Sequence, residues 1–293
     1  MRFTVFTPTY NRGKLLQALY ESLLQQTFKD FEWVIVDDGS VDDTEEIVSR
    51  MQKAGNFFPI IYKKVPNSGK HRAWNQGIDL ASGDLFFGCD SDDYLTDDAL
   101  EITDRIEKAI PSEEKKHYAG VCGLKGYKDS QIVGKTFDKA DYMDMTHLER
   151  IKNNVIGDKA EVFYTPVWKK YKYHEFEGEN FLTEATSLNR MAEDGLKIRY
   201  FNTVIKIIEY LPDGLSAGSI ERFARNPKGW GLYLHQQIKY KQLTGLEKCY
   251  KLWEYYDVCI RKMSVHEIAD NLEMSVFALK FNVLIERIHK KLR

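Results

Sequence analysis

The sequence contains few cysteines, no long apolar run and almost no net charge. Its four cysteines are irregularly spaced and form neither a CxxC pair nor a disulfide framework, which predicts reduced thiols in a cytoplasm. No run approaches the ~20 apolar residues that a membrane span requires. The first residues run directly into a strand-like pattern, without an apolar stretch long enough for a signal peptide. We therefore expect a cytoplasmic protein that is neither exported nor embedded in a membrane.

The charge is small overall but unevenly distributed. The formal net charge is -2 over 293 residues, which argues against a dedicated nucleic-acid binder. Residues 215–293 nevertheless hold 14 lysines and arginines against 8 aspartates and glutamates, a balance of +6, which leaves -8 for the rest. With 43% hydrophobic and 29% charged residues, the chain is typical of a soluble globular protein. Its length allows one large α/β domain with an appendage, or two small domains.

Short apolar runs alternate with helical patterns in the first hundred residues. The predicted strands are Phe3–Phe6, Phe31–Val36, Ile60–Tyr62 and Leu85–Cys89. Strands that alternate with helices at this spacing predict a mostly parallel sheet with right-handed crossovers. The expected fold class is therefore α/β, with a Rossmann-like central sheet flanked by helices and a helical appendage at the C-terminus.

Polar residues follow each of these four strands. The strand exits are Thr9–Asn11, Asp37–Asp38, Asn67–Lys70 and Asp90–Asp93. Taken singly, each has an ordinary explanation as a turn, a helix cap or a plain loop. The carboxyl ends of parallel strands meet at one edge of a sheet, so the four together predict a binding site there.

The fourth exit, Cys89-Asp90-Ser91-Asp92-Asp93, contains three carboxylates in four residues. Carboxylate oxygens suit hard ions such as Mg2+ or Mn2+, and a site with few protein ligands leaves room for phosphate oxygens of a substrate. The alternative is that these acids only start the following helix, because Thr96-Asp97-Asp98 is itself an N-terminal signal.

In order and spacing, the exit motifs resemble those of family 2 glycosyltransferases with the GT-A fold. The motifs are Pro8-Thr9-Tyr10-Asn11-Arg12, Val36-Asp37-Asp38-Gly39-Ser40, Asn67-Ser68-Gly69-Lys70 and Asp90-Ser91-Asp92-Asp93. The resemblance implies a nucleotide-diphosphate-sugar donor, usually a uridine one, and a divalent metal, Mn2+ or Mg2+, held by an Asp-x-Asp motif. It also implies transfer of the sugar, with inversion, to a hydroxyl of a saccharide or lipid-linked acceptor.

Carried over by position, the resemblance also assigns roles to residues. Thr9 and Tyr10 would line the nucleotide pocket, Asp38 or Asp37 would accept from the uracil ring, and Lys70 would lie near the donor. Asp90 and Asp92 would flank the ribose and the metal, with Asp92 preferred as the direct ligand. The remaining residues of the expected donor site are Asn11, Asn67 and Ser91.

The reaction also needs a carboxylate that takes the proton of the acceptor hydroxyl. We divide the chain into a donor-binding half (1–112), an acceptor-binding half (113–213) and a helical tail (214–293), and expect the base in the second part. The family often uses a Glu-Asp or Asp-Glu pair at a helix start, and that pair is absent here. We choose Glu184, with Glu179 and Asp158 as competitors. The ordinary explanation for Glu184 is a first-turn acid that interacts with the helix dipole.

The tail after Asp213-Gly214 reads as helical, basic and aromatic. Its last segment superficially resembles a helix-turn-helix reader, but residues 275–281 offer mostly apolar side chains where base edges need hydrogen bonds, so we expect no nucleic-acid partner. We expect the tail to dock on the catalytic domain and to present a basic, aromatic surface to an anionic membrane. The rival explanation is that its basic residues pair with the acidic front and its aromatic residues form a core.

Two other functions are compatible with this pattern. A nucleotidyltransferase also uses paired aspartates and a metal at strand ends, but it usually has a Gly-rich loop with Arg and Lys after its first strand. This chain has Pro8-Thr9-Tyr10-Asn11-Arg12 there. The second alternative is a catalytically idle protein that binds a nucleotide sugar. The sugar, the acceptor and the linkage depend on the shape of the pocket and are not predicted from the sequence.

Overall fold

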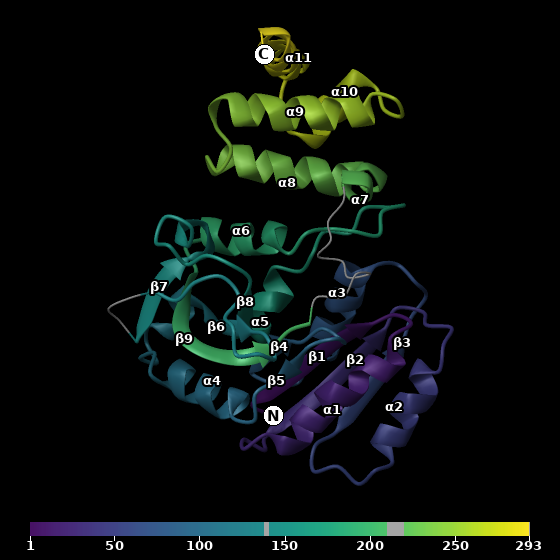
Figure 1. The fold of residues 1–293 in the computed structure, drawn as a ribbon, viewed down its shortest axis with the longest axis vertical. Helices are drawn as coiled ribbons and strands as arrows, with labels where there is room; N and C mark the ends of the chain where they lie inside the picture. The colour runs from purple at the N-terminus through teal and green to yellow at the C-terminus, as the bar shows by residue number, and fades with distance from the viewer. Residues whose placement is uncertain (138–140, 210–219, 293) are drawn as a thin grey trace. The chain divides into compact units, whose positions relative to one another are not determined.

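The computed structural model describes residues 1–137, 141–209 and 220–292 (Figure 1). The chain divides into two compact units. Unit 1 comprises Met1–Lys172 and Arg190–Gly214, and unit 2 comprises Tyr173–Asn189 and Leu215–Arg293. Residues 173–189, which we assigned to the acceptor-binding half, thus cluster with the C-terminal helices. The turn predicted at Asp213-Gly214 lies outside the described residues.

Among its described residues, unit 1 forms a nine-stranded sheet in the order β3-β2-β1-β4-β8-β6-β9-β5, with β7 paired to β9. The strands are β1 (Phe3–Thr9), β2 (Phe31–Asp37), β3 (Ile60–Lys64), β4 (Leu85–Gly88), β5 (Tyr94–Leu95), β6 (Tyr118–Gly126), β7 (Tyr142–Thr146), β8 (Lys159–Tyr164) and β9 (Lys197–Ile207). The predicted α/β class is confirmed. The sheet is parallel from β3 to β4 but mixed beyond it, because β8 joins β4 and β6 in antiparallel fashion.

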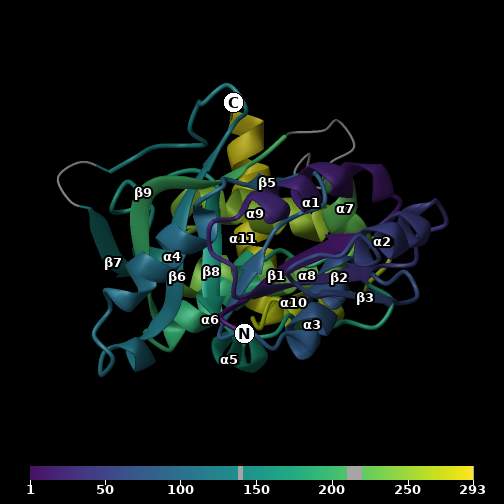
Figure 2. The ribbon, with the colours of Figure 1, turned by 90° about the horizontal axis from the view of Figure 1, so that it is seen from below.

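Helices flank this sheet. They are α1 (Leu16–Gln25), α2 (Thr44–Gln52), α3 (Lys70–Leu80), α4 (Ala99–Lys108) and α5 (Thr165–Lys170), with short 3-10 helices η1 (Gly13–Leu15), η2 (Lys115–His117) and η3 (His147–Glu149). Figure 2 shows β1, β2 and β3 between α1 and α2 on one side and α3 on the other. This layering fits the alternation of side chains along a strand.

The side chains of β1 point alternately to the two faces of the sheet and show how each face is packed. Phe3 and Val5 pack in the core with α1, whereas Phe6 faces α3 and meets the ring of Trp74 edge-on at 5.2 Å between centroids. A Cβ added at Gly77 of α3 would lie 2.1 Å from the Phe6 ring, so the helix approaches the sheet this closely only because residue 77 is glycine. Both faces are thus tightly packed, and the loops at the carboxyl edge of the strands are held on a rigid support.

Unit 2 is helical, with a core of its own. Its helices are α7 (Ile220–Arg225), α8 (Pro227–Lys239), α9 (Gly245–Cys259), α10 (Val265–Asn271) and α11 (Val276–Leu292), and α6 (Ala185–Glu193) spans the division between the units at Asn189. Trp230 and Tyr255 meet edge-on at 5.0 Å inside this core, so these aromatic residues of the tail serve packing. No helix in the described part of the chain is long and apolar enough to cross a bilayer.

All four cysteines are buried free thiols. They are Cys89, Cys122, Cys249 and Cys259. Burial raises the pKa of each thiol above its ordinary value. Because the thiolate is the reactive form, these side chains are inert in the folded protein.

Candidate active site

The loops that follow β1 and β2 are joined by Asn11. Its backbone N–H donates to Ser40 Oγ at 2.8 Å, and the backbone N–H of Val41 donates to Asn11 Oδ1 at 2.8 Å. Asn11 has a φ of +53°, in the left-handed region that asparagine tolerates better than most residues. One short polar side chain therefore fixes the first strand exit against the second.

The second and third exits are joined by Asp38 and Gly39. Asp38 accepts from the backbone N–H of Ser68 at 2.8 Å and from that of Gly69 at 2.9 Å. Burial raises the pKa of Asp38, although these two donors favour its charged form. Gly39 has a φ of +87°, and a Cβ there would lie 2.8 Å from the backbone nitrogen of Asn67, so only glycine allows the two loops to approach this closely.

The fourth exit is joined to the third and to the first by ion pairs. Lys70 Nζ, in the first turn of α3, lies 2.8 Å from Asp90 Oδ1, and Arg12 Nη1 lies 2.7 Å from Asp92 Oδ2. The four exits thus form a closed ring of contacts, which we call the exit ring: first to second, second to third, third to fourth, and fourth back to first. The predicted convergence of the four loops is confirmed.

Two buried lysines from the other half of the sheet adjoin the exit ring. Lys206 of β9 donates to the backbone oxygen of Gly88 at 2.6 Å, and its Nζ lies 4.0 Å from Asp93 Oδ2. Lys125 of β6 pairs with Lys206 in the strand register, and its Nζ lies 2.6 Å from Asp158 Oδ2. Cations and carboxylates therefore alternate around the carboxyl end of β4.

This arrangement separates the pKa values of neighbouring carboxyl groups. Burial raises the pKa of Asp90, but Lys70, Lys206 and Lys125 outweigh burial and hold it well below its usual range. For Asp93, burial is the largest influence and raises the pKa to about 7 despite Lys206, with the charge of Asp90 adding to the increase. At neutral pH, Asp90 is therefore charged, whereas the Asp93 carboxyl group is close to its titration midpoint.

The exit ring lies inside a segment that matches a known family. The sequence model of the family described as "Glycosyl transferase family 2" matches residues 4–157, a little over half of the chain. The chain belongs to this family. The resemblance drawn from the four exit motifs is thereby confirmed.

Similar proteins of this glycosyltransferase family come from several bacteria. The "GalNAc(5)-diNAcBac-PP-undecaprenol beta-1,3-glucosyltransferase" of Campylobacter jejuni is 35% identical over 191 residues, which cover 63% of this chain and 58% of that protein. "Glycosyltransferase GlyG" of Streptococcus pneumoniae is 25% identical over 228 residues, which cover 75% of this chain and 72% of that protein. The chain thus spans little more than half the length of the C. jejuni relative.

Among solved structures, the family 2 chain is similar to TarS residues 1–349 of S. aureus, solved in complex with UDP-GlcNAc. The TM-score is 0.63 at 21% identity, and the match covers 89% of this chain and 72% of that one. At this identity the likeness concerns the fold. It confirms the predicted GT-A type.

The donor-site residues predicted in this glycosyltransferase differ in accessibility. Tyr10 and Asn67 are exposed, whereas Thr9 and Ser91 are buried. Thr9 Oγ1 is buried at the first exit and has no hydrogen-bond partner among the described residues. A buried hydroxyl without a partner is costly, and a polar ligand that bound there would relieve that cost.

Asp37 and Asp38 have different surroundings. Asp37 has no exposed surface, and its two oxygens accept from the backbone N–H of Ser40 at 2.7 Å and from the hydroxyl of Tyr62 at 2.6 Å. Asp37 therefore positions the second exit loop and offers nothing to solvent. Of the two, Asp38 is the better candidate for contact with a base of the nucleotide.

Two of the three predicted base candidates have identified partners. Burial raises the pKa of Asp158, but the ion pair with Lys125 outweighs burial and leaves it below its ordinary value, which weakens this carboxylate as a base. Glu179, in unit 2, is buried and accepts from the backbone N–H of Lys228 at 2.6 Å and of Gly229 at 2.8 Å. Glu179 thus caps the N-terminus of α8.

Glu184 is exposed and directly precedes α6. Its backbone carbonyl accepts from the N–H of Ser187 at 3.1 Å, so the residue occupies the helix start that the sequence predicts for it.

The donor chemistry at the fourth exit fits a divalent cation with few protein ligands. Asp90 and Asp92 supply carboxylate oxygens two residues apart at a strand end, and both side chains are partly exposed. The described residues contain no group of three or more His, Cys, Asp or Glu side chains arranged to hold a metal. Further ligands would therefore have to come from substrate phosphates and water.

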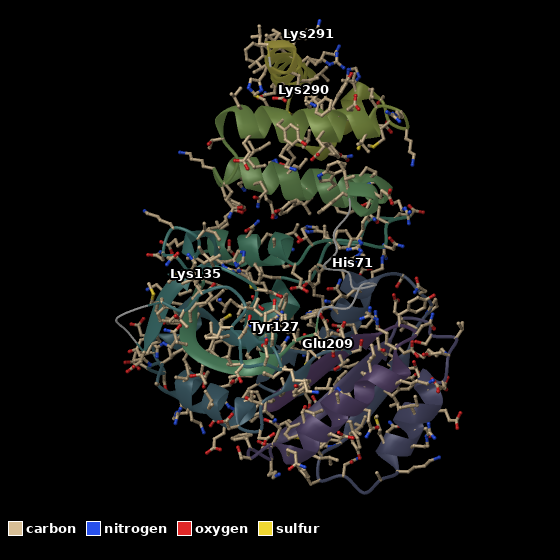
Figure 3. All side chains as sticks on the ribbon, in the orientation of Figure 1. His71, Tyr127, Lys135, Glu209, Lys290 and Lys291 are labelled. Carbon is tan, nitrogen blue, oxygen red and sulfur yellow. The ribbon has the colours of Figure 1, made fainter. Side chains whose placement is uncertain are left out.

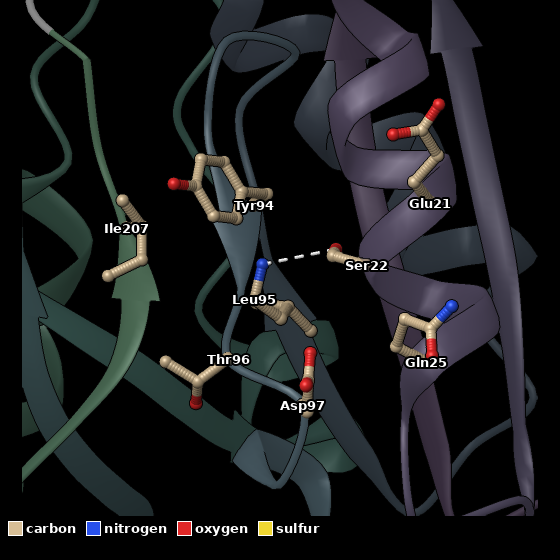
Figure 4. Close-up of a pocket in the computed structure, with 8 residues that line it drawn as sticks. All are labelled: Glu21, Ser22, Gln25, Tyr94, Leu95, Thr96, Asp97 and Ile207. Carbon is tan, nitrogen blue, oxygen red and sulfur yellow. Dashed lines mark hydrogen bonds between the residues drawn. The ribbon is translucent and has the colours of Figure 1, made fainter. Parts of the chain in front are cut away.

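A hollow of about 630 Å³ lies close by in unit 1, between α1, β5 and the end of β9 (Figure 4). Its lining includes Glu21, Tyr94, Asp97 and Ile207, and Figure 4 shows the bond of 3.2 Å from the backbone N–H of Leu95 to the hydroxyl of a serine on α1. Of the described residues that line it, none belongs to the predicted donor site. The hollow therefore has no part in the function proposed below.

Sequence reasoning missed three residues of this site. Arg12 stood inside a quoted motif but was given no role, and neither Lys125 nor Lys206 was considered. A signal for the lysines existed, because Lys125 directly follows the apolar run Val121–Leu124 and Lys206 interrupts the apolar run Val204–Ile208. A charged residue in a buried strand requires a partner.

Proposed function

We propose that this chain transfers a sugar from a UDP-sugar to a hydroxyl of a lipid-linked saccharide, with inversion, in the synthesis of a surface glycan. The exit ring carries the proposal: four strand-exit loops inside the family match converge on alternating cations and carboxylates. The family match also argues against the nucleotidyltransferase alternative.

Donor recognition is assigned to the first three exits. Thr9 has a buried hydroxyl without a partner among the described residues, and Tyr10 offers an exposed ring beside it. Asp38 is held at the junction of the second and third loops by two backbone donors, and its carboxylate would accept from the N3–H group of a uracil ring. A uridine donor is supported by these groups and by the UDP-GlcNAc bound to TarS.

The diphosphate belongs next to Lys70 and Arg12. As the bond between the anomeric carbon and the phosphate oxygen breaks, negative charge develops on the leaving diphosphate, and fixed cations stabilise it. Asp90 and Asp92 are the residues that would hold a divalent ion, Mn2+ or Mg2+, which would supply further neutralisation of that charge when bound. In the structure, Asp90 pairs with Lys70 and Asp92 pairs with Arg12.

The acceptor hydroxyl requires a base, and Glu184 is assigned that role. The hydroxyl oxygen bonds to the anomeric carbon on the face opposite the diphosphate, its proton passes to the Glu184 carboxylate, and UDP leaves with the electron pair of the broken bond. Asp158, which pairs with Lys125, and Glu179, which caps α8, remain the alternatives. The name of the C. jejuni relative includes undecaprenol, which supports a lipid-linked acceptor.

The test is a panel of UDP- and GDP-sugars, each incubated with the chain and Mn2+ or Mg2+, with and without a lipid-linked saccharide, and scored for nucleoside-diphosphate release. We expect release from one uridine donor and loss of that release when the metal is chelated. If no panel member is cleaved while calorimetry still detects UDP binding, the chain is the idle nucleotide-sugar-binding protein and the proposal fails.

A further inference from the structure

Helix α11 is apolar on two opposite faces. Leu279 and Val283 pack into the core of unit 2. The opposite face exposes Phe277, Phe281, Leu284, Ile288 and Leu292, at 80, 55, 54, 49 and 82% of their surface. Their spacing of three or four residues aligns them on one side of the helix, and we call them the outer stripe. The outer stripe runs almost the full length of α11, and each of its side chains exposes about half of its surface or more.

Basic side chains border the outer stripe along one edge. At about 100° per residue, Lys280, Arg287 and Lys291 fall beside it, and all three are exposed. Within Val276–Leu292 there is one acid, Glu286, and it is buried. The exposed surface of α11 thus joins large apolar side chains to positive charge and presents no carboxylate.

Lys290 does not belong to this surface. Its Nζ lies 3.1 Å from the ring centroid of Trp253 on α9, and Figure 3 shows it on the side of α11 that faces α9, whereas Lys291 lies on the outer side. Trp230 and Tyr255 are core residues of unit 2. Trp230, Trp253 and Tyr255, which belong to the aromatic residues that motivated the expected membrane surface of the tail, are therefore engaged in packing, and α11 exposes the outer stripe instead.

The charge pattern disfavours a second copy of the chain as the occupant of the outer stripe. A symmetric pair uses the same patch on both partners, so Lys280, Arg287 and Lys291 of one copy would gather with those of the other. No exposed acid on α11 offsets them. Like charges brought together at an interface oppose association.

We propose that the outer stripe of α11 docks on a bilayer that contains anionic lipid. The apolar side chains enter the boundary between headgroups and acyl chains, and the basic edge contacts lipid phosphates, as in an interfacial amphipathic helix. The inference goes beyond the proposed sugar transfer and does not depend on it. It gives the expected membrane contact of the tail a defined surface.

The test is flotation of the full 293-residue chain with vesicles of phosphatidylcholine alone or mixed with phosphatidylglycerol, at low and high salt. We expect binding only to the anionic vesicles, and weaker binding at high salt. A chain that stays in the soluble fraction with both vesicle types at low salt overturns the proposal, and so does equal binding to both types.

Matched variants locate the surface. Lys280→Gln with Arg287→Gln should lower partitioning about 25-fold, because each basic group near the membrane contributes about fivefold, or ~1 kcal/mol. Phe277→Ser with Phe281→Ser should lower it at least about tenfold, since both rings would enter the bilayer. Circular dichroism checks that the helices are retained.

Two control substitutions change similar side chains elsewhere. Val41→Ser alters a residue that is 87% exposed in unit 1, and Lys262→Gln alters an exposed lysine between α9 and α10. Both should bind vesicles as the wild type does, and equal losses in the controls and the α11 variants would overturn the proposal. Sedimentation without lipid tests the rival: if the wild type is a dimer and Phe277→Ser with Phe281→Ser makes it a monomer, the outer stripe binds a second copy.

Discussion

Replacing Glu179 with glutamine distinguishes a helix cap from a catalytic base. In the folded chain, both oxygens of Glu179 accept from backbone N–H groups at the start of α8, those of Lys228 at 2.6 Å and Gly229 at 2.8 Å. Glutamine keeps one acceptor but turns an NH2 group toward the second N–H. One buried donor therefore loses its partner, and the helix start loses its negative charge.

The magnitude follows from these two losses. A hydrogen bond to a charged group contributes about 1.5–3 kcal/mol, and a charge that complements a helix dipole about 0.3–1 kcal/mol. We expect Glu179→Gln to lower the free energy of unfolding by about 3 kcal/mol. Turnover measured well below the unfolding transition should stay within about threefold of wild type, because the substitution changes no group that we place at the reacting atoms.

The assay is urea unfolding followed by far-ultraviolet circular dichroism, where the midpoint should fall by roughly 1 M or more. Glu177→Gln is the matched control, since Glu177 is exposed and lies two residues away. Its effect should stay within about 0.5 kcal/mol. The reasoning is refuted if Glu179→Gln unfolds at the same urea concentration as Glu177→Gln while its turnover falls about 100-fold.

The remaining predictions concern the active site and pH. Asp92→Asn should abolish the metal dependence of UDP binding in calorimetry and leave the fold intact, because the loop loses one ligand and no core contact. Glu184→Gln should lower kcat by about 10²-fold or more while UDP-sugar affinity is kept, because the base acts on the acceptor. Lys206→Met should lower the free energy of unfolding by about 3 kcal/mol, and adding Asp93→Asn should restore part of it, since without its cation the buried Asp93 carboxyl group must stay charged and unpaired or take up a proton. Burial lowers the pKa of His147 to about 3 from its ordinary 6.5. The unfolded chain therefore binds one more proton than the folded chain as the pH falls below 6.5. At pH 5 the free energy of unfolding of the wild type should be lower by up to about 2 kcal/mol, a loss that His147→Asn should not show.

Each of these predictions has an outcome that contradicts it. Unchanged affinity of Asp92→Asn for UDP with Mn2+ would remove Asp92 from the metal site. If Glu184→Gln keeps its turnover while Asp158→Asn loses it, the base is Asp158. Strictly additive losses in the Lys206 and Asp93 variants would show that the two side chains do not interact. Parallel stability curves of wild type and His147→Asn between pH 7 and 5 would mean that His147 titrates normally.

The first four strands and their exits were predictable because the signals are local. An apolar run that ends in a polar turn indicates both a buried strand and the place where its loop begins, and parallel strands bring such loops to one edge. The resemblance of the exit motifs to family 2 glycosyltransferases rested on the same segments. The structure adds the contacts that close the exit ring, such as Arg12 with Asp92.

Strand β9 was not predicted, and with it Lys206 was missed. Lys197–Ile207 mixes charged and polar residues with Ile, Tyr and Val, and its charged side chains are tolerated because partners reach them from distant segments. Arg199 pairs with Asp144, and Lys206 lies near Asp93 and Gly88. Such pairings join residues that can be more than a hundred positions apart, so no pattern within one segment indicates them.

The difference between Asp37 and Asp38 was also beyond the sequence. An aspartate at either position is compatible with a turn, a helix cap or a contact to a nucleotide. Adjacent residues at the end of a strand project in opposite directions. Whether a carboxylate is buried against Tyr62 or faces Ser68 depends on what packs over each face. Glu179 is a similar case, because its partners on α8 lie about fifty residues further along the chain.

Because every native cysteine is buried, the folded chain should react little with thiol-specific probes. Maleimide probes react with accessible thiolates, and the four native thiols are buried with raised pKa values. A single introduced thiol, for example Ala278→Cys beside the outer stripe, would then carry the maleimide fluorophore on the folded protein. Its emission would report directly on whether α11 leaves water when vesicles are added, without removal of any native side chain from the core.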